Sequence, residues 1–280
     1  MCDTCGCGQP ENKVTITVPG SEPVDPREHT HTHGGITYTH THDHEAGHTH
    51  DHGDDHDHLQ SKEIIVGQDI LTRNNLLAER NRGFFEACNI LVLNLVSSPG
   101  SGKTVFLERT LRDMTGIPYT IIEGDQQTMN DAMRIKETGA PVVQINTGTG
   151  CHLDAEMIHK ALKVLKPADD SVLFIENVGN LVCPALFDLG ENYRVVIMSV
   201  TEGEDKPLKY PTMFRSSHLC VINKMDLLPY VDFDLDKARS YAAQVNPHLK
   251  FFEVSAKTGQ GMNLWYDWLK NTRTLMASTG

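Results

Sequence analysis

The segment Ser97-Ser-Pro-Gly-Ser-Gly-Lys-Thr104 has the residue types and the spacing of a phosphate-binding loop. It follows the apolar run 90–96 and precedes a helix-like stretch, a context in which backbone N–H groups converge on phosphate oxygens. Lys103 is expected to reach the β- and γ-phosphates, and the Thr104 hydroxyl to bind Mg²⁺. An ordinary glycine-rich turn is the less favoured alternative, although Ser97 replaces the usual first glycine. The expected nucleotide-binding residues of the loop are Pro99, Gly100, Ser101, Gly102, Lys103 and Thr104.

Two later motifs predict which base the bound nucleotide carries. The buried-strand pattern 219–222 ends in Asn223-Lys224-Met-Asp226, which resembles the guanine-specificity motif of GTPases. The Asp226 carboxylate can accept hydrogen bonds from guanine N1–H and N2–H₂, a donor pair that adenine lacks. Ser255-Ala256-Lys257 follows another strand pattern and resembles the loop whose alanine N–H meets guanine O6. We therefore expect GTP rather than ATP.

Acidic residues after two other expected strands are candidates for the metal and the water. Asp125 is a candidate Mg²⁺ ligand, direct or through water, with Glu123 in support. Glu176 and Gly179 resemble the Asp-x-x-Gly switch of GTPases, and the Gly179 N–H would sense the γ-phosphate. The alternative is that these carboxylates cap the next turn or helix. The expected catalytic set is Lys103, Thr104, Asp125 and Glu176, and the sequence singles out no general base.

Three thiols stand within six residues at the start of the chain, in Cys2-x-x-Cys5-Gly-Cys7. Such a turn can aim its sulfurs at one metal, with the α-amino group as a fourth ligand. This donor set suits square-planar Ni²⁺ as well as tetrahedral Zn²⁺. A reactive tail without a ligand role is the alternative.

A second candidate metal site combines Cys151-His152, after an expected strand, with Cys183, close to the proposed switch. If these groups meet beside the nucleotide, the segment 176–183 ties metal occupancy to the γ-phosphate. The alternative is that each cysteine is a small buried apolar residue, which is our interpretation of Cys88 and Cys220.

The stretch 29–58 alternates histidine with Thr and Asp. It lacks core-forming residues, so we expect it to be disordered without metal. Neutral imidazoles bind Ni²⁺ and Zn²⁺, which favours a native metal reservoir over a uniform expression tag. The histidines concerned are His29, His31, His33, His40, His42, His44, His48, His50, His52, His56 and His58.

The elements that position these residues alternate along the chain after an amphipathic helix over 64–85. This alternation predicts an α/β P-loop NTPase fold, a mostly parallel sheet with helices on both faces. Ligands then bind at the carboxyl ends of the strands. We expect a Cys- and His-rich, largely disordered tail over 1–60 and a GTPase domain over 61–280. Strands are expected at 90–96, 119–122, 142–145, 172–175, 195–200, 219–222 and 250–254, and helices near 103–114, 129–138, 153–165, 235–245 and 262–275.

Composition narrows the function classes. The 280 residues carry 37 acidic and 25 basic side chains, a net charge of −12, which disfavours nucleic-acid binding. The longest apolar runs are strand-sized and no signal segment is recognised, so we expect no membrane association and a cytoplasmic location. In that compartment the seven cysteines serve as ligands or buried thiols rather than disulfides.

Several phrases together resemble the HypB family, the nickel-incorporation GTPases of [NiFe]-hydrogenase maturation, which share the serine at position 97. The resemblance covers both the tail and the GTPase domain. The phrases are Met1-Cys-Asp-Thr-Cys-Gly-Cys7, Leu93 through Thr104, Ile122-Glu-Gly-Asp-Gln-Gln-Thr128, Gly150-Cys-His-Leu-Asp154, Ile175 through Pro184 and Val200 through Pro211.

The resemblance implies a slow GTPase of the signal-recognition and MinD-like class that dimerises with nucleotide. It implies a tight nickel site at Cys2, Cys5 and Cys7. A weaker nickel or zinc site would be formed by Cys151, His152 and Cys183 at the dimer interface, and Lys206 would contact the other subunit. The implied partners are a HypA-type metallochaperone and the hydrogenase large-subunit precursor. Nickel delivery to another enzyme such as urease, nickel storage, and a translation or signalling GTPase with incidental thiols stay open as alternatives.

Overall fold

The computed structural model describes residues 14–20, 28–33, 36–41, 57–125 and 130–279. Most of the strands in these ranges form one sheet. Its order is β1-β6-β5-β7-β4-β8-β9-β10, and every pair is parallel except β1 with β6. The carboxyl ends of the seven parallel strands therefore share one edge. The strands are β1 (Thr15–Thr17), β4 (Leu91–Ser97), β5 (Tyr119–Asp125), β6 (Val142–Asn146), β7 (Val172–Gly179), β8 (Tyr193–Ser199), β9 (Leu219–Asn223) and β10 (Lys250–Glu253).

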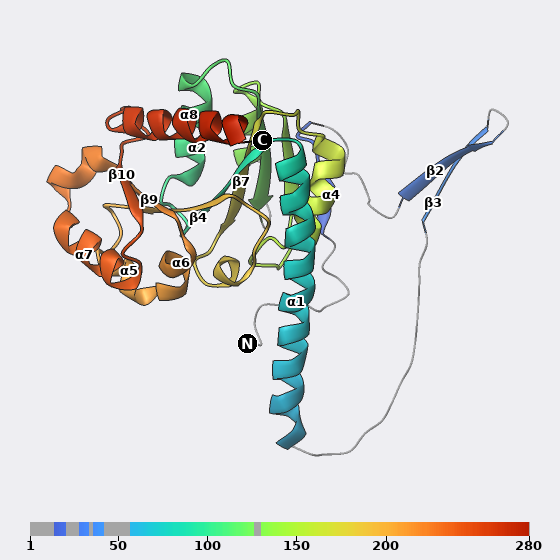
Figure 1. Ribbon diagram of the computed structural model, residues 1–280, viewed down its shortest axis with the longest axis horizontal. Helices are drawn as coiled ribbons and strands as arrows, with labels where there is room; N and C mark the ends of the chain where they lie inside the picture. The colour runs from blue at the N-terminus through green and yellow to red at the C-terminus, as the bar shows by residue number, and fades with distance from the viewer. Residues whose placement is uncertain (1–13, 21–27, 34–35, 42–56, 126–129, 280) are drawn as a thin grey trace.

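Helices cover both faces of this sheet (Figure 1). Alternate residues of β4 show why, since Leu91, Leu93 and Leu95 pack on one face and Val92 and Val96 on the other. The first face is covered by α2 (Lys103–Asp113), α3 (Asn130–Lys136) and α8 (Met262–Thr279). The second is covered by α1 (Asp57–Ala87), α4 (Ala155–Leu165), α6 (Pro211–Ser216) and α7 (Leu235–Val245).

These elements confirm the predicted fold class, because each of the seven expected strands is present in the parallel sheet. The first helix is longer than the predicted 64–85, and Figure 1 shows it running beside α4. Four short helical elements were not predicted: η1 (Cys183–Leu186), α5 (Lys206–Lys209), α6 (Pro211–Ser216) and η2 (Met225–Tyr230). No helix in the described ranges is long and apolar enough to cross a membrane.

The strand β1 corrects one expectation, because it lies in the part of the chain expected to be largely disordered. Thr15 pairs with Asn146 and Thr17 with Gln144, antiparallel to β6. Ile16 is buried in the core between the sheet and α4. The Lys136 ammonium donates to the Pro19 carbonyl at 2.5 Å. The missed signal is the alternation of β-branched residues from Val14 to Val18, which suits a half-buried strand.

The histidine-rich stretch also contains strands that the sequence analysis does not predict. Residues of β2 (Glu28–His33) pair antiparallel with β3 (Ile36–Thr41), with His29 opposite His40. The β-branched threonines between the histidines favour strands, and Gly34-Gly35 is a two-residue hairpin signal in the sequence. The expected ligands Cys2, Cys5, Cys7, His42, His44, His48, His50, His52 and His56 lie outside the described residues. His58 lies in the first turn of α1.

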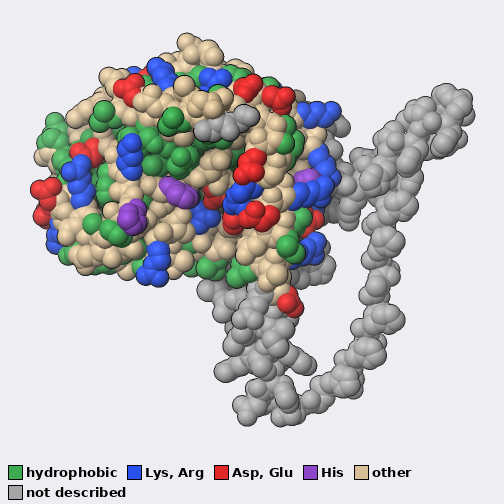
Figure 2. Space-filling model, in the orientation of Figure 1, with side chains coloured by type: hydrophobic (Ala, Val, Ile, Leu, Met, Phe, Trp, Pro, Cys, Tyr) green, Lys and Arg blue, Asp and Glu red, His purple; other side chains and the backbone are tan. Residues whose placement is uncertain are grey.

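The surface carries both signs of charge. Figure 2 shows acidic and basic side chains interspersed over the visible face, often next to one another. Ion pairs on the surface include Lys237 with Glu204 at 3.1 Å and Arg82 with Asp188 at 2.9 Å. The predicted boundary between the tail and the GTPase domain stays a prediction.

Candidate nucleotide and metal site

The phosphate-binding loop connects the end of β4 to the start of α2. Gly100 and Gly102 both have positive φ, at 78° and 89°, a backbone region that favours glycine. A Cβ on Gly102 would lie only 2.6 Å from Asn223 Nδ2, so no larger residue fits there. Because α2 begins at Lys103, the loop N–H groups lie at the positive end of the helix dipole.

Lys103 and Thr104 both contact Glu176, which comes from the neighbouring strand β7. The Lys103 ammonium donates to Glu176 Oε1 at 3.0 Å and to the Asn177 carbonyl at 2.6 Å. The Thr104 hydroxyl donates to the same Glu176 oxygen at 2.6 Å. It also lies 3.1 Å from Asp131 Oδ2 of α3. Three of the four predicted catalytic residues therefore meet, and Asp131 is a neighbour that sequence reasoning missed.

The carboxylates around Thr104 suit a hard divalent cation. Glu123 and Glu176 are paired across β5 and β7 and are 3 % and 1 % exposed. One buried oxygen of each, Oε2, has no hydrogen-bond partner among the described residues. Burial and then the charge of Glu176 raise the pKa of Glu123 to about 9, against the opposing effect of Lys103. Orphaned carboxylate oxygens beside a hydroxyl are the donor set that Mg²⁺ takes, so the residues fit this ion.

Asp125 ends β5 on the same edge, opposite Asn146 of β6. Its charge contributes to the raised pKa of Glu123, so it belongs to the same acidic group. Its main-chain carbonyl accepts from the Thr147 N–H at 2.9 Å. The role of Asp125 as a Mg²⁺ ligand stays a prediction.

Gly179, the predicted γ-phosphate sensor, lies against the phosphate-binding loop. It is the last residue of β7, and a Cβ placed on it would lie 3.2 Å from Pro99 Cγ. The backbone of β7 therefore comes close to the loop at the point where Glu176 contacts Lys103.

The guanine-recognition motifs lie against the same loop. Asn223 Nδ2 donates to the Ser101 carbonyl at 3.1 Å, and Asn223 Oδ1 accepts from the Ala256 N–H at 3.1 Å. Lys224 Nζ donates to the Gly100 carbonyl at 2.7 Å. The predicted order of motifs therefore corresponds to one connected site, held together by Asn223.

The predicted base-recognition carboxylate is held by a neighbouring hydroxyl. Asp226 Oδ1 accepts from the Ser255 hydroxyl at 2.5 Å, which orients the carboxylate. Lys257, the last residue of the Ser-Ala-Lys motif, is exposed.

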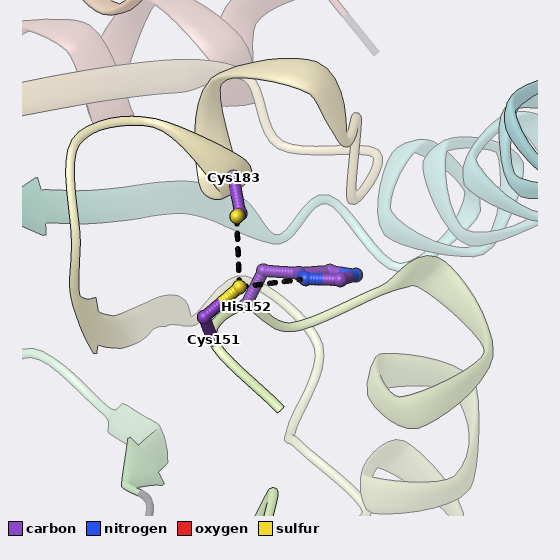
Figure 3. A group of neighbouring side chains, drawn as sticks. All are labelled: Cys151, His152 and Cys183. Atoms are coloured by element: carbon purple, nitrogen blue, oxygen red, sulfur yellow. Dashed lines mark hydrogen bonds between the residues drawn. The ribbon is translucent and has the colours of Figure 1, made fainter. Parts of the chain in front are cut away.

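Cys151, His152 and Cys183 lie together, as the sequence predicts (Figure 3). The Cys151 thiol lies 2.7 Å from Cys183 Sγ and 3.8 Å from His152 Nδ1. All three ligand atoms are within 4.8 Å of one another, and the side chains are half-buried. This spacing allows one soft or borderline cation such as Ni²⁺ or Zn²⁺ to bind all three.

The imidazole of the triad is held by packing, and its surroundings disfavour the protonated form. The His152 ring stacks on Phe187, with centroids 3.9 Å apart and planes at 21°. Burial lowers the pKa of His152, although the nearby Asp154 opposes the shift. A neutral imidazole is the form that ligates metal.

The triad is tied to the end of β7. Asn180, the residue after β7, donates from Nδ2 to the Cys151 carbonyl at 3.4 Å and accepts from the Val182 N–H at 2.8 Å. Cys183 then opens the short helix η1. The segment that begins at Glu176 beside Lys103 thus ends at the candidate metal ligand Cys183. Asn180 is a residue that the sequence analysis missed, although it stands inside the motif that carries Cys183.

The remaining thiols and Lys206 have other surroundings. Cys88 is half-buried and Cys220 is buried, and burial raises the pKa of both thiols. The Lys206 ammonium donates to the hydroxyl of Ser98 in the phosphate-binding loop and to Glu202. Lys206 thus lies at the nucleotide site of its own chain, and its contact with a second subunit stays a prediction.

Comparisons with known proteins agree with this geometry. The sequence profile described as "CobW/HypB/UreG, nucleotide-binding domain" matches residues 91–253. The chain is 47 % identical to the hydrogenase maturation factor HypB of Escherichia coli K12, over 98 % of this chain and 99 % of the other. It is 39 % identical to the hydrogenase/urease maturation factor HypB of Helicobacter hepaticus, over 77 % and 90 %.

A solved structure is similar as well. The crystal structure of HypB from Helicobacter pylori in complex with nickel matches with a TM-score of 0.69 and 36 % identity, over 72 % of this chain and 95 % of that one. The phosphate-binding loop, the cysteine–histidine triad and these similarities together place the chain in the HypB family of CobW/HypB/UreG nucleotide-binding proteins.

Proposed function

We propose that this protein is a nickel-binding GTPase that uses GTP binding and hydrolysis to drive nickel insertion into the large subunit of [NiFe]-hydrogenase. The observation that carries the proposal is the path of one segment. Residues 176–183 begin at Glu176, which binds Lys103 and Thr104, and end at Cys183, which contacts Cys151. A group that senses the nucleotide and a group that holds the metal thus belong to one short piece of chain.

GTP changes the contacts at the first end of this segment. Lys103 and Thr104 bind Glu176 in this structure, and both are the groups that a P-loop directs to phosphate and metal. When the β- and γ-phosphates enter, Lys103 leaves Glu176 and the Asn177 carbonyl. Mg²⁺, held by Thr104 and the Glu123–Glu176 carboxylates, would neutralise charge on the phosphates. The Gly179 N–H then faces the γ-phosphate, and the segment takes a second position.

Movement of the segment changes metal affinity at its other end. Nickel is the cargo, bound by the Cys151 and Cys183 thiolates and the neutral His152 ring. A shift of Cys183 relative to Cys151 alters this ligand geometry, so the two nucleotide states differ in nickel affinity. By reciprocity, bound metal must change nucleotide affinity by the same factor. Zn²⁺ is the competing ion for the same donors.

The tail would supply the cargo. Cys2, Cys5 and Cys7 form a tight nickel site, and the histidines between positions 29 and 58 hold exchangeable nickel. The protein works in the cytoplasm as a nucleotide-dependent homodimer. Its partners are a HypA-type metallochaperone and the hydrogenase large-subunit precursor. The E. coli relative, named a hydrogenase maturation factor, supports this assignment.

A second candidate is nickel delivery to urease, which the name of the H. hepaticus relative favours. Nickel storage is the third, favoured by the histidine content of the tail. In cells lacking the native protein, Lys103→Ala separates a switch from a store. A switch loses hydrogenase activity at scarce and abundant nickel alike, whereas a store keeps it at both. Urease activity measured in the same cells tests the second candidate.

The exposed Lys270 of α8 provides the matched control, because Lys270→Ala removes the same charge away from the site. Deletion of residues 29–58 should reduce hydrogenase activity only at scarce nickel. Full hydrogenase activity with Lys103→Ala would refute the proposed switch.

A further inference from the structure

A buried chain of polar side chains leads from Asn177, whose carbonyl accepts from Lys103, toward the metal triad without following the backbone from 178 to 183. Its members are Asn177, Asn94, Glu191 and Arg194, which we call the relay. They are 1 %, 0 %, 8 % and 5 % exposed. Buried polar groups cost free energy unless paired, so such a chain behaves as one unit whose members adjust together.

The first half of the relay runs from the nucleotide site into the sheet. Lys103 Nζ donates to the Asn177 carbonyl at 2.6 Å. The Asn177 side-chain amide donates to Asn94 Oδ1 of β4 at 3.2 Å. Asn94 Nδ2 in turn donates to Glu191 Oε1 at 3.0 Å. A displacement of Asn177 would therefore change the hydrogen bond between Asn94 and Glu191.

The second half runs from Glu191 to the metal triad. Arg194 donates from Nε to Glu191 Oε1 at 3.0 Å, and its other guanidinium nitrogens donate to the carbonyls of Ala185 and Phe187 at 3.2 and 2.8 Å. Ala185 lies in η1, the helix that begins with the ligand Cys183. Phe187 carries the stacked His152 ring.

We propose that Asn94 and Arg194 are positioning residues that couple the position of the Lys103–Asn177 contact to the geometry of the Cys151–His152–Cys183 metal site. The inference rests on the proposed function, because the relay would connect the nucleotide site of that function to its metal site. The rigid guanidinium fork holds two carbonyls of the 185–187 turn at once, so movement of Glu191 must move the turn or break a buried bond. In this account, departure of Lys103 toward phosphate releases Asn177, and the relay passes that change to Phe187 and η1.

The test uses the full chain and measures affinity for a fluorescent GDP and a non-hydrolysable fluorescent GTP analogue, with and without Ni²⁺. The tail also binds nickel, so the same measurement on Cys151→Ala/Cys183→Ala defines the contribution of the triad. In the wild type, nickel bound at the triad should change the ratio of GDP affinity to GTP-analogue affinity by at least about five-fold. Five-fold is the lower end of the coupling that is typical between two sites.

Asn94→Ala cuts the relay in its middle and leaves the Glu191–Arg194 pair in place. We expect it to keep nucleotide affinity without metal and to lose the nickel-dependent change. Thr110→Ala is the matched control, because Thr110 is 0 % exposed and its hydroxyl bonds the Phe106 carbonyl and the Trp265 indole N–H, outside the relay. It should lose comparable stability and keep the nickel effect.

Arg194→Lys provides a second cut that keeps the charge beside Glu191 but loses the fork to Ala185 and Phe187. It should also abolish the nickel effect, and thermal melting shows which variants are folded. A wild-type ratio that nickel leaves unchanged would overturn the coupling in the proposed function and the relay with it. A normal wild-type response that persists in folded Asn94→Ala or Arg194→Lys would overturn the relay alone.

Discussion

The Asn223 side chain bonds the Ser101 carbonyl at 3.1 Å and, through its other atom, the Ala256 N–H at 3.1 Å. One amide therefore fixes the phosphate-binding loop to the loop expected to meet guanine O6. Base recognition and phosphate recognition depend on each other in this arrangement, because neither loop can move without breaking a buried hydrogen bond.

Asn223→Ala should weaken binding of both GDP and GTP and lower the free energy of unfolding by about 1–3 kcal/mol, the cost of leaving buried polar groups unpaired. Denaturant unfolding and nucleotide titration measure the two effects. Asn263→Ala, at an exposed position of α8, is the control and should change neither. Normal nucleotide affinity in the Asn223 variant would contradict the connecting role.

Asp226→Asn should reduce affinity for GTP by about 100-fold, because an amide cannot accept from both guanine donors as a carboxylate does. Affinity for xanthosine triphosphate should rise, since the new NH₂ group can donate to the xanthine O2. Competition binding with the two nucleotides measures the change. The exposed Asp232, replaced by Asn, serves as the control for charge. Unaltered preference for guanine would remove Asp226 from base recognition.

Cys183→Ala should abolish nickel binding at the triad while leaving the fold intact. The thiol is half-buried and its loss removes one of two sulfurs that lie 2.7 Å apart. In a Cys2→Ala/Cys5→Ala/Cys7→Ala background, the thiolate-to-Ni²⁺ absorption band should disappear. Cys88→Ala, outside the triad, should keep the band. Retention of the band in the Cys183 variant would assign the thiolate signal elsewhere.

His218 should make stability depend on pH. Its Nδ1 accepts from the Arg194 main-chain N–H at 3.0 Å. Burial lowers the pKa of His218, the charge of Glu191 opposes this shift, and the charge of Arg194 adds to it. The folded state therefore binds the proton more weakly than the unfolded state. The stabilisation is present above the unfolded pKa of about 6.5 and is lost as pH falls through the lower folded value.

His218→Gln keeps an acceptor for Arg194 and removes the titration, so the loss of unfolding free energy between pH 7 and pH 5 should become smaller. Urea unfolding across this range measures it, with the exposed His248→Gln as control. An identical pH profile for wild type and His218→Gln would exclude His218 as the source.

Local sequence was enough to predict the parallel sheet and the phosphate-binding loop, and it offered the meeting of Cys151, His152 and Cys183 as one of two interpretations, which the family resemblance favoured. Each of these depends on short patterns placed at strand ends, and parallel strands bring their ends to one edge. The contact of Thr104 with Asp131, and the path from Asn94 to Glu191 and Arg194, depend on packing between distant elements. The spacing of residues in the sequence does not predict such contacts.

The residues alone did not predict the strand β1 or the surroundings of Lys206. Thr15–Thr17 lacks the length of an ordinary strand, and only the exposed edge of β6 gives it a partner. A cross-subunit role for Lys206 was taken from family resemblance, whereas its contact with Ser98 is made within one chain.

The direction of β1 has a consequence for the first residues of the chain. Because it runs opposite to β6, Thr15 stands beside Asn146, five positions before Cys151. The covalent chain therefore limits how far Cys7 can lie from this edge, since the eight residues from Cys7 to Thr15 span at most about 28 Å. A tether of this length raises the effective concentration of one thiol group at the other, which favours the proposed supply of nickel from the tail.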